Sequence, residues 1–372
     1  MKKYIHERAA WPETKLDEGL LYAPLVQLHH TMGRLFGKLE ILGFGVQNEL
    51  LLSSVSDEIA TSSEIEGEKL NRSSIRSSVA KRLGLETAGM ADGATDHYTA
   101  GVVDMALDAT QNYDLPITDE RLFGWHAALF PTGRSGMRPI RVGAYRTAEI
   151  SIVSGVIGKE IEHYRALEAK RVPEEMKRFI DWLETDKDTD PYINAGIAHL
   201  WFESIHPFDD GNGRIGRAIA DCMLARAENS PLRYYSLSAQ MLKERKAYYD
   251  ELELASGYSG ELVRWVTWFL GCLTRAVTES EQKIEAAKQK AVFFGQLRNI
   301  ELNARQLAVL SRLIEGFEGK LTTVKWAKLC KCSHDTALRD IDYLIQKGIL
   351  LRSTAGGRST SYELAQSALS DA

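Results

Sequence analysis

Few cysteines and no long apolar run set the first limits on this 372-residue chain. Four cysteines fit a reducing compartment better than a disulfide framework, so we expect a cytoplasmic protein. No apolar stretch approaches the ~18 residues of a membrane span, and no membrane partner is expected. The lysines at the N-terminus are not followed by an apolar segment, so no signal peptide is predicted. The net charge of −5 excludes a chain covered by nucleic acid along its whole length.

Two common nucleotide-binding signatures are also absent. The chain lacks G-x-x-x-x-G-K-[ST], which argues against a P-loop NTPase. It lacks the H-R-D and D-F-G patterns, which argues against a protein kinase. Any nucleotide site in this chain must therefore be built from other residues.

Hydrophobic periodicity predicts a mainly α-helical protein with three regions. Residues 1–95 form an N-terminal helical region, in which 71–81 is rich in Ser and Arg and has few strong helix formers. Residues 96–290 form the largest region, with helices predicted over 97–110, 118–130, 173–184, 190–205 and 261–294. Residues 291–372 are predicted to be a separate small domain.

β-Structure is predicted in two places. Residues 143–164 combine β-branched residues with turn signals at Gly155 and Gly158, a pattern typical of a β-hairpin between helices. In the C-terminal region, Asn303, Thr322 or Thr323, and Ser333 are suited to cap three successive helices. A hairpin turning at Gly356-Gly357 follows them. This order of elements is the outline of a winged helix-turn-helix domain.

Residues 206–217, HPFDDGNGRIGR, lie between two helical patterns and carry most of the chemistry. Pro207 cannot continue the first helix. A glycine-rich turn at the start of the second helix directs backbone N–H groups and the positive end of the helix dipole outward, which suits a phosphate. Arg214 and Arg217 lie three residues apart on one helix face, where planar guanidinium groups can hold phosphate oxygens.

Two further side chains complete this site. A carboxylate at Asp210 would repel a phosphate unless a cation lay between them, and Mg²⁺ bridging the two resolves the conflict. His206 is the only side chain of the stretch that can accept a proton near neutral pH. The residues therefore predict a nucleotide phosphate site with a metal carboxylate and a general base.

The same stretch matches the Fic family signature, H-P-F-x-[DE]-G-N-G-R-x-x-R, without a departure, and the chain resembles Fic proteins over about residues 96–290. The resemblance implies a helical Fic fold with a β-hairpin flap. It implies transfer of AMP from ATP to a Tyr, Ser or Thr hydroxyl of a target protein or of the chain itself, with release of pyrophosphate. The roles implied are base for His206, Mg²⁺ ligand for Asp210, and nucleotide contacts for Gly211, Asn212, Gly213, Arg214 (β-phosphate) and Arg217 (γ-phosphate).

Other segments resemble accessory parts of Fic proteins. The hairpin resembles the flap that docks the target backbone, with Ile150, Ser151, Ile152 and Val153 as its edge; an ordinary surface hairpin is the alternative. Tyr248 and Tyr249 resemble paired tyrosines that line the adenine end of the nucleotide, and helix core packing is the alternative. Fic proteins of this size often pair, so a homodimer is expected.

Ser62, Glu66 and Gly67 fit the pattern [ST]-x-x-x-E-[GN], which resembles the inhibitory motif of many Fic proteins. The resemblance implies that Glu66 pairs with Arg217 and blocks productive binding of the γ-phosphate. Two alternatives remain open. Ser63 and Glu66 also fit a capping box at a helix start, and Glu66 could instead help to activate a water that removes AMP from a modified target.

The C-terminal region is locally basic. Between Lys320 and Arg358 it has eight basic and three acidic residues, and a helix from Ser333 would present His334, Thr336 and Arg339. These are suited to contacts with DNA phosphates and the groove. A DNA-binding regulator with a nucleotide-sensing Fic domain is therefore a second hypothesis, and dimerisation or target docking by this region is the alternative.

Overall fold

The computed structural model describes residues 4–8, 11, 16, 18–85, 96–154, 161–185, 188–258, 261–314, 316–317, 319–353 and 360–365. Across these ranges the fold is mainly helical, with three two-stranded antiparallel sheets, which confirms the predicted fold class. The chain divides into two compact units, Met1–Ser280 and Glu281–Ala372. Residues 1–95 and the predicted catalytic region thus share one unit. The predicted boundary near residue 95 and the turn residues Gly155, Gly158, Gly356 and Gly357 lie outside the described residues.

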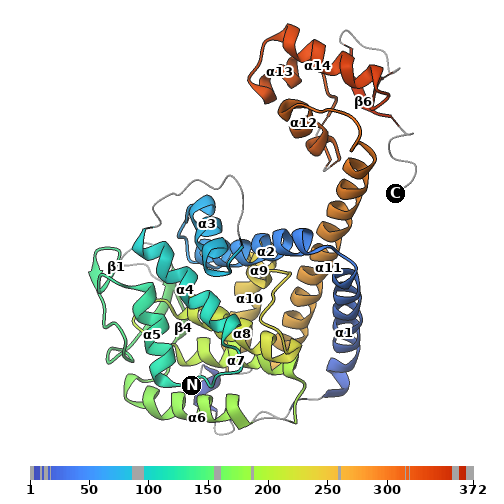
Figure 1. Ribbon diagram of the computed structural model, residues 1–372. Coiled ribbons are helices and arrows are strands. Elements are labelled where there is room, and N and C mark those ends of the chain that lie inside the picture. The colour runs from blue at the N-terminus through green and yellow to red at the C-terminus, as the bar shows by residue number, and fades with distance from the viewer. Residues whose placement is uncertain are drawn as a thin grey trace. The chain divides into compact units, whose positions relative to one another are not determined.

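The first unit holds most of the helices and two of the sheets (Figure 1). Its elements are η1 (Ile5–Glu7), α1 (Glu18–Glu40), α2 (Phe44–Ile65), α3 (Arg72–Arg82), α4 (His97–Gln111), α5 (Asp119–Leu129), β1 (Arg134–Ser135), β2 (Arg138–Pro139), β3 (Ser151–Ser154), β4 (Ile161–Arg165), η2 (Ala169–Arg171), α6 (Val172–Thr185), α7 (Pro191–Ile205), α8 (Asn212–Glu228), α9 (Leu237–Lys243), α10 (Arg245–Ser256) and the first part of α11 (Leu262–Gln296).

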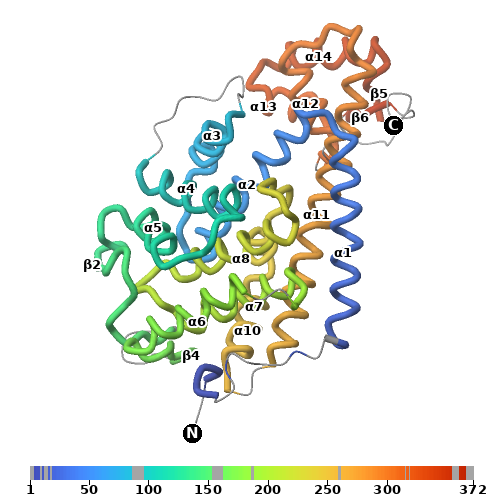
Figure 2. The backbone as a smooth tube through the Cα atoms, turned by 60° about the horizontal axis from the view of Figure 1, so that its bottom comes forward, coloured from blue at the N-terminus to red at the C-terminus, as the bar shows by residue number. Residues whose placement is uncertain are grey.

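Helices α7 and α8 form the centre of this unit, as the tube in Figure 2 shows. Both are buried along nearly their whole length, α4 and α2 pack against α8, and α6 packs against α7. The first part of α11 approaches α7 closely, because Trp265 Nε1 donates to the carbonyl of Gly196 at 2.7 Å and a Cβ at Gly196 would lie 3.0 Å from the Phe269 ring. Both views place α1 alongside this part of α11. None of the described helices is long and apolar enough to cross a membrane.

Helix α3 is the main departure from the sequence-based expectation. Its Ser- and Arg-rich sequence has low intrinsic helix propensity, yet Asn71 caps it through hydrogen bonds from the backbone N–H groups of Ser73 and Ser74 at 2.9 and 3.1 Å. Ile75 and Val79 are fully buried, one turn apart. Capping and packing of this apolar face therefore outweigh propensity.

The predicted hairpin between helices is present as β3 and β4, which pair antiparallel with an irregularity between Ile152 and Val153. The shorter pair β1 and β2 was not anticipated, because two-residue strands leave no period in a sequence. Within the described residues, β3 and β4 form a sheet of two strands, so β3 has an outer edge that pairs with no other strand of that sheet.

The second unit has the element order expected for it: α12 (Ala304–Ile314), α13 (Thr323–Cys330), α14 (His334–Gln346), β5 (Leu350–Arg352) and β6 (Tyr362–Leu364). Thr322 and Ser333 cap α13 and α14 as predicted. Asn303 and Gln306 cap α12 reciprocally, each side chain bonding the other's backbone N–H. Trp326, Ile341 and Leu344 are fully buried in the core of this unit.

Candidate active site

The loop between α7 and α8 begins at His206, which ends α7 in the left-handed backbone region with φ 51° and ψ 60°. A non-glycine residue holds this conformation at a cost, so something must fix it. The buried guanidinium of Arg146 does so by donating to the carbonyls of His206 (2.7 Å), Ile205 (3.3 Å) and Leu167. Burial lowers the pKa of Arg146, and the carbonyls supply the partial negative charge it needs.

Asn212 and His126 close the rest of the loop. The Asn212 side chain accepts from Phe208 N–H at 2.9 Å and donates to Phe208 C=O at 2.8 Å. His126 Nδ1 accepts from the N–H of Gly143, so Nε2 carries the proton and donates to the carbonyl of Asp210 at 3.2 Å. Its ring stacks on Phe208 at 4.3 Å between centroids. Burial lowers the pKa of His126 to about 4, which keeps this arrangement neutral.

Gly211 and Gly213 open the start of α8. Gly211 is the N-cap with φ +81°, a conformation suited to glycine, and a Cβ there would lie 2.8 Å from the Phe130 ring. The first N–H groups of a helix have no intrahelical acceptor. Because the Asn212 amide is engaged within the loop, its contribution to an anion site is its backbone N–H. The residues predicted to form the nest, Gly211, Asn212 and Gly213, thus lie at a helix N-terminus.

Asp210 lies at the rim of this nest with its side chain 40% exposed. It accepts hydrogen bonds from Ser135 and from the N–H of Gly211, and it is 3.8 Å from Arg214. The described residues contain no group of three His, Cys, Asp or Glu that could hold a metal ion alone. A Mg²⁺ bound with a nucleotide needs only one or two carboxylates beside the phosphate oxygens. Asp210 fits that limited role.

A cavity of about 490 Å³ lies beside the loop. Among its lining residues are His206 and Glu203 from the end of α7, Gly213 from α8, Glu66 from the end of α2, and Ile152 from the flap strand β3. The site therefore collects the predicted base, one member of the predicted nest, the predicted inhibitory carboxylate and part of the predicted flap around one space.

Glu66 reaches this space because α2 ends beside it. Glu66 is the C-cap of α2, and Gly67 follows with φ +85°. The N–H of Glu68 bonds the carbonyl of Ser63 and the N–H of Gly67 bonds that of Glu64, which is a Schellman motif. Ser63 and Glu66 therefore lie at a helix end, and the interpretation of this pair as a capping box at a helix start is wrong.

Arg217 is held by this helix end. Its guanidinium is 2% exposed and lies 2.7 Å from Glu66 Oε1, 2.9 Å from Ser62 Oγ and 2.8 Å from the Ser62 carbonyl. Burial alone would disfavour the charge, but Glu66 raises the pKa of Arg217. A Cβ at Gly213 would overlap Glu66 Oε1. The Glu66 carboxylate thus lies directly against Gly213 of the predicted nest.

A second carboxylate, from Glu68 just after the end of α2, forms an ion pair with Arg214. Glu68 lies 2.8 Å from the buried Arg214 guanidinium, and the Tyr98 hydroxyl on α4 bonds both groups. Burial raises the pKa of Glu68, with Arg214 opposing that shift. Arg214 also lies over the Phe130 ring at 5.1 Å. Both signature arginines therefore have a carboxylate where a phosphate is expected.

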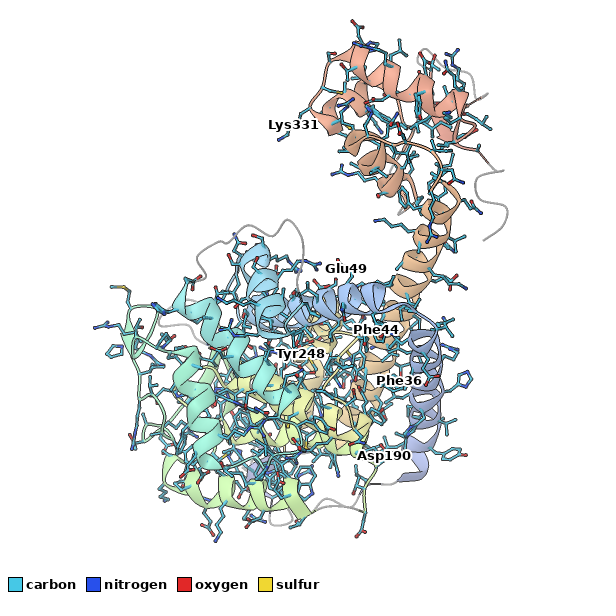
Figure 3. The ribbon with its side chains drawn as sticks, viewed as in Figure 1. Phe36, Phe44, Glu49, Asp190, Tyr248 and Lys331 are labelled. Atoms are coloured by element: carbon cyan, nitrogen blue, oxygen red, sulfur yellow. The ribbon has the colours of Figure 1, made fainter. Side chains whose placement is uncertain are left out.

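The two tyrosines of α10 differ in environment. Tyr248 is 1% exposed, bonds His199 Nε2 at 2.9 Å through its hydroxyl, and lies inside the first unit (Figure 3). Tyr249 is 40% exposed, and its hydroxyl bonds the carbonyl of Ile65 at 3.3 Å. Both line the cavity, Tyr248 with its hydroxyl engaged in the core and Tyr249 from the solvent side.

The predicted flap edge lies at the same cavity. Ile152 is 39% exposed, and Ser151 donates to Glu162 on the neighbouring strand at 2.8 Å. Ile150 lies just before β3 and its carbonyl accepts from Ala166 N–H. Val153 belongs to β3 and pairs with Glu162 through the backbone.

Comparison with known proteins agrees with this geometry. Residues 116–224 match the Fic/DOC family, and residues 4–85 match a domain of unknown function (DUF4172). The signature lies within the first match, so the chain carries a Fic domain. A Fic family protein from Desulfovibrio desulfuricans covers 95% of this chain and 98% of its own at 22% identity and a TM-score of 0.54. A Fic domain-containing signalling protein from Bacteroides thetaiotaomicron covers 68% and 97% at 19% identity and a TM-score of 0.51. These two likenesses show the fold.

Curated relatives match a shorter segment. A protein adenylyltransferase of Caenorhabditis elegans is 29% identical over 131 residues, which are 34% of this chain and 23% of that protein. One from Culex quinquefasciatus is 32% identical over 104 residues, 27% of this chain and 19% of the relative. A probable protein adenylyltransferase of Aquifex aeolicus is 42% identical over 53 residues, 14% and 17% of the two chains. The chain thus spans about a fifth of the length of these relatives.

Four site residues were not singled out from the sequence: Glu68, Tyr98, His126 and Glu203. Glu203 stands three residues before His206, a spacing that could have drawn attention to it. His126 and Tyr98 lie on helices remote in sequence from the signature, and their spacing carries no signal. Arg146 lies within the segment predicted as a hairpin, and its hydrogen bonds to the loop carbonyls appear only in three dimensions.

Proposed function

We propose that the chain is a protein adenylyltransferase held inactive by the end of α2. The target hydroxyl gives its proton to His206 and attacks the α-phosphorus of ATP, and pyrophosphate leaves. Asn212 and Gly213 bind phosphate oxygens through backbone N–H groups, Gly211 does so once its N–H leaves Asp210 Oδ1, and Arg214 and Arg217 neutralise the β- and γ-phosphates. Asp210 would hold Mg²⁺, which would supply neutralisation of the negative charge on the phosphates.

The observation that carries the inhibition is the position of Glu66, paired with Arg217 at 2.7 Å and in van der Waals range of Gly213. A γ-phosphate and the Glu66 carboxylate would compete for the same guanidinium. Glu68 on Arg214 adds a second competition of the same kind. Nucleotide in the productive position therefore requires the end of α2 to give up these two ion pairs.

The test is transfer of label from ATP carrying ³²P at the α-phosphate. Glu66→Gly is expected to label itself or an added target protein, and adding His206→Ala abolishes the label. Glu64→Gly is the matched control, because Glu64 lies in the same turn but is 37% exposed and makes only a distant ion pair, 4.0 Å from Arg72. The Glu64→Gly protein should stay as inactive as wild type. No label from ATP with Glu66→Gly would refute the proposal. Removal of AMP from a modified target, lost in Glu66→Gly, would favour the reverse reaction.

The proposal also covers how the target docks, what borders the base of the nucleotide, the compartment and the oligomeric state. Ile150, Ser151, Ile152 and Val153 offer the open strand edge to an extended segment of the target, whose hydroxyl then reaches His206. Tyr249 borders the base of the nucleotide from the solvent side, and Tyr248 supports it from the core. The four cysteines are all free, which fits a reducing cytoplasm. Pairing into a homodimer stays a prediction.

A second candidate function is DNA binding by residues 291–372 as a winged helix. One observation favours it: Asp340, one of the three acidic residues between Lys320 and Arg358, is 6% exposed and bonds Arg305 and Asn303 inside the unit. The exposed face of α14 is therefore less acidic than its sequence indicates. The test is salt-dependent binding of the full chain to random DNA, lost with Arg339→Ala. Absence of any salt-dependent binding would refute this function.

A further inference from the structure

Glu203 and His206 share a buried corner of the cavity. Glu203 is 8% exposed on the last turn of α7, and its Oε2 lies 3.7 Å from His206 Nδ1. His206 Nδ1 and Glu203 Oε1 are buried and make no side-chain hydrogen bond among the described residues, and the Glu203 backbone also lies near the imidazole. A buried polar atom without a partner is costly, and the two side chains lie side by side, with Glu203 Oε2 towards the imidazole and the unpartnered Oε1 towards α8. A further 0.7–1 Å of approach is about what a hydrogen bond needs, and catalytic contacts often tighten when substrate binds.

The backbone is built to bring these two groups together. The left-handed turn at His206, clamped by Arg146, folds the imidazole back over the end of α7 where Glu203 projects. On the other side, a Cβ at Gly216 would lie 2.9 Å from Glu203 Oε1. The Glu203 carboxyl group is thus confined between α8 and the His206 ring, with little freedom to turn elsewhere.

We propose that Glu203 is a positioning residue that holds His206 by Nδ1 and leaves Nε2 as the base. This rests on the proposed function of the site. The Nδ1–H tautomer is the one a base acting through Nε2 requires. When the target O–H attacks, its proton passes to Nε2, the O–P bond forms and the bond to pyrophosphate breaks. The imidazolium then lies against the Glu203 carboxylate, and Nε2 returns its proton to water after the products leave.

The charges around Glu203 and His206 decide the pH range in which Glu203 is a carboxylate and His206 is a neutral imidazole. Burial raises the pKa of Glu203 to about 8, with Glu66 adding to the rise and Arg217 opposing it. Burial lowers the pKa of His206 to about 4, and Arg146 adds to the lowering; the nearby Glu203 backbone, Glu66 and Asp210 oppose it.

Two tyrosines also face the pair from other elements. Burial raises the pKa of Tyr164 on β4 and of Tyr248 on α10, so both stay neutral. Because the negative charge of Glu66 adds to the raised pKa of Glu203, removing Glu66 should lower that pKa and favour the ionised Glu203 carboxylate. The charge proposed to inhibit the site therefore also affects the ionisation of the group beside His206.

The first experiment measures kinetics in the Glu66→Gly background. Glu203→Leu is expected to lower kcat about 100-fold while the KM for ATP changes less than about twofold, and Glu203→Gln to lower kcat about tenfold. The kcat of Glu66→Gly should rise with pH through one ionisation that Glu203→Gln abolishes. Glu175→Gln is the control, since Glu175 is also buried but bonds Trp201 and Arg178 away from His206; it leaves kcat and the pH profile unchanged.

The second experiment needs no turnover. Long-range ¹H–¹⁵N NMR of histidine-labelled wild-type protein at about pH 9, with His206→Ala for assignment, should report the Nδ1–H tautomer of His206. Glu203→Leu should move it toward Nε2–H. An Nε2–H tautomer in wild type, or a kcat unaffected by Glu203→Leu in an active Glu66→Gly protein, overturns the inference. An inactive Glu66→Gly protein with the expected tautomer refutes the proposed function instead.

Discussion

Replacing Arg146 with methionine removes a buried guanidinium that holds the turn after α7. The carbonyls of Leu167 and Ile205 are buried and would lose their donor, at about 1–3 kcal/mol each. The expected destabilisation is therefore about 2–6 kcal/mol. For a unit of this size, 1 kcal/mol corresponds to about 2–3 °C in Tm, so the melting temperature should fall by about 4–18 °C. Arg146→Lys should recover only part of this, because an ammonium lacks the planar fork that reaches several carbonyls at once.

The assay is thermal unfolding of the full chain followed by circular dichroism. Arg138→Met is the matched control, since Arg138 is exposed and donates a single bond to the Asp209 carbonyl at 2.8 Å; its effect should stay within about 0.5 kcal/mol. Equal melting temperatures for the two methionine variants would refute the argument that these carbonyls depend on Arg146.

Three other predictions concern the residues that follow α2, Gly67 and Glu68, and the second unit. Glu68→Gln should weaken the hold on Arg214 and, added to Glu66→Gly, lower the KM for ATP by about two- to fivefold; an unchanged KM would show that Glu68 does not compete with nucleotide. Gly67→Ala forces a side chain into φ +85° at about 1–2 kcal/mol with no steric clash, so it should raise basal label transfer above wild type, and unaltered background labelling would contradict this. Asp340→Ala leaves Arg305 unpaired and should speed hydrogen exchange in 304–314, as mass spectrometry measures, whereas Asp335→Ala should not.

The sequence predicted the local parts of the site better than its distant contacts. The helix–loop–helix at 206–217 follows from Pro207 and the glycines, because those residues restrict the backbone wherever they stand. The pairing of Glu66 with Arg217 was predicted from resemblance alone, and the structure has it at 2.7 Å. The two-residue strands β1 and β2 left no pattern to read.

Residues that act on the site through tertiary contacts could not be found in this way. Tyr98 and Arg214 are more than a hundred residues apart, and only packing of α4 on α8 brings them together. Helix α3 is present despite the low helix propensity of its sequence, because Ile75 and Val79 are fully buried. The two tyrosines of α10 are adjacent in sequence, but helix geometry turns one into the core and the other to solvent.

Gly67, which follows the C-cap of α2, bears on how activity would depend on the ATP concentration. Gly67 fixes Glu66 and Glu68 on one turn of the same chain as their arginines, so in the proposed function the two carboxylates compete intramolecularly, at an effective concentration that does not depend on protein concentration. Cellular ATP is a soluble competitor and cannot dilute them. In the proposed function, displacement of the last turn of α2 would therefore release both arginines in a single event, because one helix end carries both carboxylates.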